Sequence, residues 1–139
     1  MTRRGVTLPE LVLTVALVAI VCGIAAPRVM RVANAAALRE AKAGVHRALD
    51  AARGAAIRLG QPVELITVPG ALRVVAAPGP VTLWQSPDQG ERGVTLEGLS
   101  APIRFGPAGV AIGASNRTLR LRRGHDTVDV VLSRLGRIR

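Results

Sequence analysis

A charge-free segment near the N-terminus restricts what this chain can fold into more than any other feature. Residues 11–27 are seventeen consecutive residues without a charged side chain. With residues 6–9 included, the apolar stretch reaches about the 20 residues that a membrane-spanning helix requires. Glu10 lies at its entrance, where an unpaired carboxylate close to hydrocarbon costs free energy. We therefore expect a membrane helix, and we expect Glu10 to have a function that explains this cost.

Two conventional export signals fit the segment poorly. A secretory signal peptide has an uninterrupted apolar region followed by small residues at a cleavage site, whereas Glu10 interrupts the start of this region and no such site follows. Cys22 suggests a lipoprotein signal, but Val21 before it is larger than the residue usually found there. Both interpretations are weaker than the one that follows.

The segment resembles the leader and first helix of type IV prepilins. Arg3 and Arg4 form a short basic leader, Gly5 matches its last residue, and Val6 matches the first residue of the mature chain. The resemblance implies that a prepilin peptidase cleaves after Gly5 and methylates the amine of Val6. Valine replaces the phenylalanine that is commonest in the family at this position, and it keeps the apolar character.

Glu10 matches the acidic residue that is fifth in the mature chain of this family. A buried carboxylate is tolerated when it gains a cationic partner. In a filament of packed helices, Glu10 would meet the Val6 amine of a neighbouring subunit and set the axial register. The alternative is that Glu10 is solvated at the level of the lipid headgroups.

Charge alone leaves the orientation in the membrane open. Arg3 and Arg4 precede the apolar segment, and four basic residues follow it: Arg28, Arg31, Arg39 and Lys42. Counting positive charges favours a cytoplasmic C-terminus. The prepilin resemblance implies the opposite, a single-pass protein of the bacterial inner membrane with a periplasmic C-terminal head, and we follow the resemblance.

The chain is long enough for one membrane helix and one small domain, with 139 residues in all. We expect a leader at residues 1–5, a transmembrane and assembly helix at 6–27, an amphipathic continuation at 28–60 and a β-rich head at 61–139. Removal of the leader takes away two arginines and changes the formal charge from +10 to +8. The single cysteine excludes an internal disulfide.

The sequence pattern changes from helical to strand-like at Gly60. Residues 28–59 read as a helix whose apolar stripe is Val45, Leu49, Ala52, Ala56 and Leu59. Gly60 is typical of a helix C-terminus, and Pro62 prevents continuation. We expect short strands at residues 63–67, 71–76, 81–84, 94–97 and 103–105, and a connection at 106–116.

The last part of the chain predicts an antiparallel hairpin with one buried face. Leu119 and Leu121 alternate with arginines, Gly124 marks a turn, and Val128, Val130 and Leu132 alternate with polar residues. A long helix laid on a small antiparallel sheet gives an α+β fold. This is the type IV pilin-like arrangement that the prepilin resemblance also implies.

A second resemblance covers the junction of helix and first strand. Residues 49–63 look like the corresponding junction of the GspH/FimT family, and residues 135–139 look like its Gly-Arg-x-Arg ending. That family contains minor pseudopilins of type II secretion and minor pilins of type IV pili. The resemblance implies a structural subunit whose partners are prepilin peptidase, other pilin or pseudopilin subunits and the inner membrane.

We find no pattern of catalytic, cofactor-binding or metal-ligating residues. His46 and His125 have no cysteine or second histidine at metal-ligand spacing. His125 next to Asp126 is more simply a solvated turn than an acid–base pair. The sequence therefore predicts neither an enzyme nor a cofactor.

Arginines gather in the last 23 residues, which contain seven of them. The candidate nucleic-acid-binding residues are Arg120, Arg122, Arg123, Arg134, Arg137 and Arg139, and Arg117 is close in sequence. Such a surface attracts phosphates without reading base sequence. The resemblance to the T-type minor pilins adds an alternative function, capture of double-stranded DNA for uptake in natural transformation, with Arg137 and Arg139 at the matching positions. A solvated polar face, a contact to acidic subunits and the arginine bias of a GC-rich genome remain alternatives. A third alternative for the whole chain is a membrane protein without a role in a filament, and this alternative predicts no cleavage after Gly5.

Overall fold

A computed structural model describes residues 7–77, 79, 81–86, 93–113, 117–133 and 136–139. The chain divides into two compact units, Met1–Ala33 and Asn34–Arg139. One helix, α1 (Leu8–Leu59), contributes to both. Each unit is described by itself.

The described part of the first unit is helical and exposed. From Leu8 to Val32 its residues are exposed, and α1 contains a segment that is long and apolar enough to cross a membrane, with a mean hydropathy of 2.4 over 18 residues. Pro27 lies inside the helix without ending it. The Arg31 side chain donates from Nε to the Pro27 carbonyl oxygen at 3.4 Å.

In the second unit, one face of α1 is buried. Val45, Leu49, Ala52 and Ala56 are each 0% exposed, which confirms most of the expected stripe. Leu59 is wrong as a member of it, because its side chain is 48% exposed. Burial ends at Ala56, and residues 57–61 are all exposed. The helix stops at Gly60, whose φ of 63° is the left-handed conformation that ends many helices.

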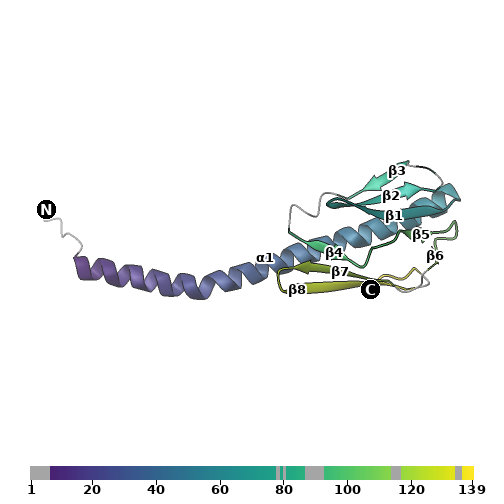
Figure 1. Ribbon diagram of the computed structural model, residues 1–139. Helices are drawn as coiled ribbons and strands as arrows, with labels where there is room; N and C mark the ends of the chain where they lie inside the picture. The colour runs from purple at the N-terminus through teal and green to yellow at the C-terminus, as the bar shows by residue number, and fades with distance from the viewer. Residues whose placement is uncertain (1–6, 78, 80, 87–92, 114–116, 134–135) are drawn as a thin grey trace. The chain divides into compact units, whose positions relative to one another are not determined.

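The strands of the head form two antiparallel sheets rather than one. The larger sheet has the order β3-β2-β1-β5-β6 and the smaller one the order β4-β7-β8. Their bounds are β1 Val63–Val68, β2 Ala71–Ala76, β3 Thr82–Gln85, β4 Thr95–Glu97, β5 Ile103–Phe105, β6 Ala111–Ile112, β7 Arg117–Arg123 and β8 Asp126–Leu132. Figure 1 shows both sheets along the same stretch of α1.

Most of the expected strands are present within one or two residues. β2 and β5 have the expected bounds, and the β7–β8 hairpin lies where alternation placed it. The expected connection at 106–116 contains a further strand, β6, which is only two residues long. Two residues are too short for alternation to be recognised in a sequence.

A single core joins the helix to both sheets. Its apolar side chains come from every strand that packs on α1: Val63, Leu65, Leu72, Val74, Ile103 and Phe105 from the larger sheet, and Leu119, Leu121, Val130 and Leu132 from the smaller one. The helix contributes mainly alanines to this core. Because these helix side chains are small, the bulk of the core is supplied by the sheets.

Gly98 marks a close approach of two backbones after β4. Its φ is 91°, and a Cβ at this position would lie 2.3 Å from the carbonyl oxygen of Thr118. Gly113 has a similar φ of 94°, but a Cβ there would meet nothing within 4 Å. An alanine at Gly98 would therefore cause both backbone strain and steric overlap, whereas an alanine at Gly113 would cause backbone strain alone.

We expect Gly98→Ala to lower the free energy of unfolding well beyond the ~1–2 kcal/mol that a left-handed alanine costs. Gly113→Ala should cost only that strain. The comparison uses urea unfolding in mild detergent, followed by the fluorescence of Trp84, the single tryptophan. Equal losses of unfolding free energy in the two variants would show that the backbone after β4 moves away from Thr118 at little cost.

Candidate assembly helix and arginine surface

The expected assembly residue stands at the start of an uncharged helix. Glu10 is exposed and lies in the first turn of α1, where a carboxylate interacts favourably with the positive end of the helix dipole. It is the single charged residue between positions 6 and 27. Gly5 and Val6, the expected processing site, lie outside the described residues.

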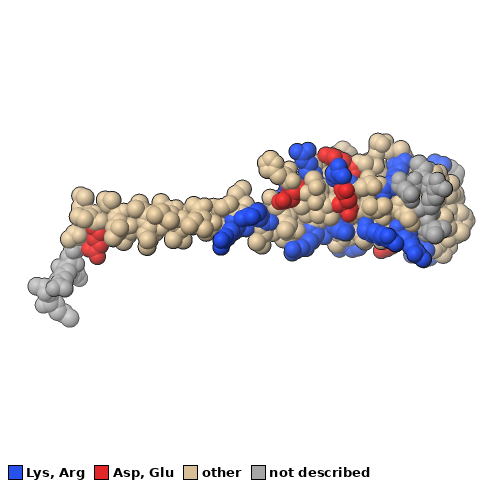
Figure 2. Space-filling view, turned by 90° about the horizontal axis from the view of Figure 1, so that it is seen from below, with Lys and Arg blue, Asp and Glu red and all other residues tan. Residues whose placement is uncertain are grey.

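The described part of the first unit carries a long, exposed apolar surface. Its exposed large side chains are Leu8, Leu11, Val12, Leu13, Val15, Leu17, Val18, Ile20, Val21, Ile24, Val29, Met30 and Val32. Figure 2 shows this part of the helix as an almost uncharged surface. A contiguous apolar surface of this kind requires lipid or other apolar helices around it.

The β7–β8 hairpin places arginines on its outer face, as the alternation predicted. Leu119 and Leu121 are buried, whereas Arg120 and Arg122 are exposed. A two-residue turn at Gly124 and His125 joins the strands, and Gly124 has the positive φ, 59°, that such turns need. In this way the hairpin fixes two of the expected arginines in an exposed row.

Arg120 is already paired with carboxylates. Its Nε and Nη2 donate to the two carboxylate oxygens of Asp129 at 2.8 and 3.0 Å. Glu97 is its partner in register on the other side, in β4. The hydrogen bond to Asp129 raises the pKa of Arg120, and the hydrogen bond from Arg120 lowers the pKa of Asp129. The positive charge of Arg120 is therefore largely compensated.

The neighbouring arginines of the hairpin make weaker or backbone contacts. Arg122 donates from Nε to the carbonyl oxygen of Gly124 at 3.2 Å, and its register neighbours are Thr95 and Thr127. Arg123 is half-buried opposite Asp126. Arg117 donates to the carbonyl oxygen of Ala101. The hairpin therefore presents less free positive charge than its sequence suggests.

Residues 136–139, the C-terminal tail, lie beside β8 and are joined to it by an isolated antiparallel bridge between Leu132 and Ile138. Ser133 N–H donates to the Arg137 carbonyl at 2.9 Å, and Val131 and Arg139 exchange two backbone hydrogen bonds at 2.9 and 3.0 Å. Arg137 and Arg139 are exposed, and Ile138 between them is half-buried against the core. The two expected arginines share one face, whereas Arg134 lies outside the described residues.

The tail and the helix together line an open cleft that the sequence did not predict. His46, Asp50 and Arg53 contribute from α1, and residues 136–139 contribute from the tail. The Arg53 Nη1 atom lies 3.9 Å from the position of a Cβ at Gly136. The sequence gives no sign that Arg53 belongs to this cleft, because no local pattern indicates which part of the chain lies beside it. The cleft gathers Arg53, Arg137 and Arg139, with Asp50 as its acidic member.

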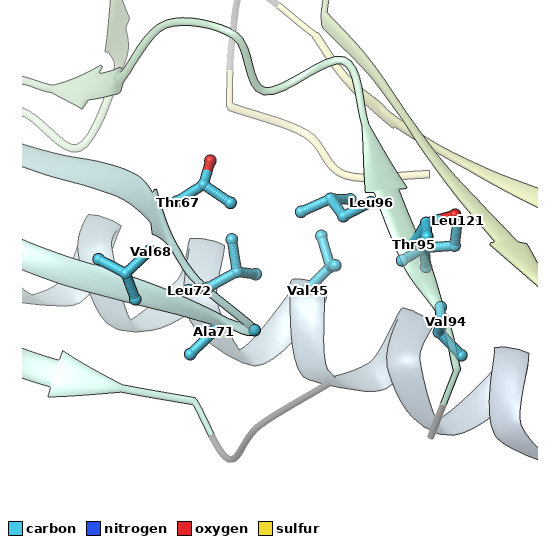
Figure 3. Close-up of a pocket in the computed structure, with 10 residues that line it drawn as sticks. Val45, Thr67, Val68, Ala71, Leu72, Val94, Thr95, Leu96 and Leu121 are labelled. Carbon is cyan, nitrogen blue, oxygen red and sulfur yellow. The ribbon is translucent and has the colours of Figure 1, made fainter. Parts of the chain in front are cut away.

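A second hollow in the head is apolar. Its volume is about 290 Å³, and it lies between the β1–β2 turn and β4. Figure 3 shows side chains from α1, the β1–β2 hairpin and β4 around it, with Leu72 and Leu96 among them. None of the described residues that line it has a titratable side chain. In the part of the chain that the structure describes, no group of three His, Cys, Asp or Glu residues is placed to hold a metal ion.

Comparisons with known proteins agree with this architecture. The family described as "Type II transport protein GspH" matches residues 43–136. A crystal structure of the Pseudomonas aeruginosa type IV minor pilin FimU is similar with a TM-score of 0.64 and 16% identity, over 73% of this chain and 86% of FimU. A second crystal form of FimU gives 0.54 and 14% identity, over 70% and 90%. No curated protein sequence matches the chain.

The Arg120–Asp129 pair predicts a pH dependence of stability. The pKa of Asp129 is lower in the folded state than its ordinary value of 3.8. The stabilisation is therefore present above that value and is lost as the pH falls through the lower, folded-state pKa. We expect Asp129→Asn to remove this part of the acid-induced loss of stability.

Urea unfolding at about pH 7 and pH 3, followed by Trp84 fluorescence, measures the effect. Arg120→Gln breaks the same pair from the other side and should reproduce the reduced pH dependence. The pair is fully exposed, so the change at neutral pH should be small. An unchanged pH dependence in both variants would mean that the pair does not form in solution.

Proposed function

Because the chain belongs to the GspH family and has a type IV pilin fold, we propose that it is a minor pilin or pseudopilin. It would be a structural subunit of a type II secretion pseudopilus or a type IV pilus. One observation carries the proposal. In the sequence, the GspH-like head directly follows an exposed apolar helix segment that has one carboxylate in its first turn. This combination suits a protein that is held in the inner membrane and then packed among other helices.

Processing precedes assembly in this proposal. Prepilin peptidase would cleave after Gly5 and methylate the amine of Val6. The head would lie on the periplasmic side of the membrane. The basic residues Arg3 and Arg4 would be removed with the leader. The support is the sequence around Gly5 and the start of α1 three residues later, at Leu8.

Glu10 would then set the position of each added subunit. Among packed apolar helices the carboxylate is poorly solvated. The Val6 amine of a neighbouring subunit would be its cationic partner. A subunit displaced along the axis would leave both charges unpaired. The energetic cost of that displacement is what would fix the register.

We expect Glu10→Gln to be cleaved normally but incorporated into filaments at a small fraction of the wild-type level. Glutamine keeps the shape of the side chain and removes the charge that the amine requires. Mass spectrometry of the mature N-terminus measures cleavage, and immunoblotting of sheared filaments measures incorporation. Normal incorporation would refute the register role, and an uncleaved wild-type chain would refute the whole proposal.

Capture of double-stranded DNA is a second candidate function, and one observation favours it. The tail brings Arg137 and Arg139 to an open cleft that Arg53 also lines, and Arg120 and Asp129 are not among the residues that line it. Three guanidinium groups along one cleft suit contacts to successive phosphates. Such binding would serve DNA uptake by a pilus of which this chain is a part.

If this second function holds, Arg137→Gln/Arg139→Gln should weaken DNA binding and reduce its salt dependence. Each lost phosphate contact lowers the slope of log K against log salt by about 0.9, so two lower it by about one to two. Arg120→Gln is the matched control, because Asp129 already compensates its charge. Fluorescence anisotropy of labelled duplex DNA with the detergent-solubilised chain gives both slopes.

Equal losses from the tail variant and from the Arg120 control would indicate only a general effect of net charge. No binding by the wild-type chain at low salt would exclude DNA capture by this surface. The assembly function would be unaffected by either result, because it is measured by filament incorporation.

A further inference from the structure

Exposed apolar side chains gather at the end of the head where α1 stops. Ile57, Val110 and Ile112 are 53%, 43% and 51% exposed, and we call them the apolar patch. They come from separate elements: the last turn of α1, the β5–β6 turn and β6. Their grouping is a product of the fold.

Two glycines hold the apolar patch together. A Cβ at Gly109 would lie 2.7 Å from Cδ1 of Ile57, and a Cβ at Gly106 would lie 2.8 Å from Cδ1 of Ile112. The N–H of Gly106 donates to the Val110 carbonyl at 2.9 Å. The two isoleucines therefore pack directly on the backbone of one tight turn, with Val110 on the same turn.

Arginines border the apolar patch. The Arg53 Nε atom lies 3.2 Å from the position of a Cβ at Gly109, and Arg53 is one helical turn before Ile57. A Cβ at Gly136 would lie 3.4 Å from the Gly109 carbonyl oxygen, and the exposed Arg137 that follows it lines the same cleft as Arg53. Asp50 is the acidic side chain of that cleft, and Arg104, the register neighbour of Ile112, is ion-paired with Glu64. Among the described residues, the unpaired excess of positive charge at the border therefore comes from Arg53 and Arg137.

We propose that the apolar patch binds a different pilin-type subunit, one with an apolar ridge surrounded by acidic side chains. An apolar centre with a charged rim is the usual anatomy of a protein–protein interface. Opposite charges at the rim steer the partner and select against wrong ones. This inference rests on the proposed assembly function and names the surface and the partner that serve it.

The charge of the chain argues against a second copy as the partner. The net charge is +10, or +8 without the leader, so two copies repel each other. DNA fits the apolar patch poorly, because its outer surface offers phosphates and sugars rather than apolar area. An acidic subunit satisfies both the rim and the centre.

The experiment uses the full-length chain in mild detergent, mixed in turn with each other pilin-type subunit of the same organism. A second, differently labelled copy of the chain and a duplex DNA serve as the competing partners. Anisotropy titrations measure affinity for the wild type, for Ile57→Ser/Val110→Ser and for Arg53→Glu. Val81→Ser/Leu83→Ser is the matched control, since both residues are exposed and β3 lies at the opposite edge of the larger sheet from β6.

We expect one acidic subunit to bind, and we expect each patch variant to weaken that binding by about tenfold or more. Added salt should weaken it further, whereas the control should bind like the wild type. Trp84 fluorescence unfolding checks that every variant is folded. Equal binding by patch and control variants, preferential binding of a second copy, or loss of DNA rather than subunit binding would each overturn the inference.

Filament incorporation separates this result from the proposed function. A wild-type chain that enters filaments, together with patch variants that bind every subunit normally, would refute the patch alone. A wild-type chain that is neither cleaved nor incorporated would refute the assembly function itself.

Discussion

The packing of two sheets on one face of α1 is the interaction on which the head depends. Alanines at positions 48, 52, 55 and 56 are almost fully buried, so the helix adds little side-chain volume to the core. The larger side chains that fill the remaining space come from the strands, among them Leu65, Phe105 and Leu121. Without cysteine pairs, this apolar burial is the main source of stability. In the first unit the same helix is exposed from Leu8 to Val32, and its residues 11–27 carry no charged side chain.

The sequence predicted local elements well because each left a local signal. Alternation of Leu119 and Leu121 with arginines marked a half-buried strand, and Gly60 before Pro62 marked the end of the helix. Long-range pairing left no such signal. The division into two sheets, the return of the tail along β8 and the cleft beside Arg53 all depend on contacts between distant residues. Leu59 fits the helical period, but the period cannot show where the covering strands stop.

The candidate site shows why a count of arginines overstates a phosphate-binding surface. Arg120 is next to Asp129 and Glu97, and both neighbours are assigned by strand register rather than by sequence distance. Arg137 and Arg139 have the same residue type and similar exposure, but the fold places them beside Arg53 and Asp50. Charge compensation therefore differs between arginines that are indistinguishable in composition. Only the register of the smaller sheet and the path of the tail separate them.

The exposed apolar surface of α1 and the apolar patch of the head differ in how specific their binding can be. In α1 before Ala33, exposed leucines and valines form a continuous surface that lipid or neighbouring helices can cover without any specific geometry. In the head, the apolar patch is small and bordered by arginines, so it discriminates by charge as well as by shape. In the proposed function, the apolar surface of α1 would hold the subunit in a membrane. The apolar patch would select the neighbouring subunit.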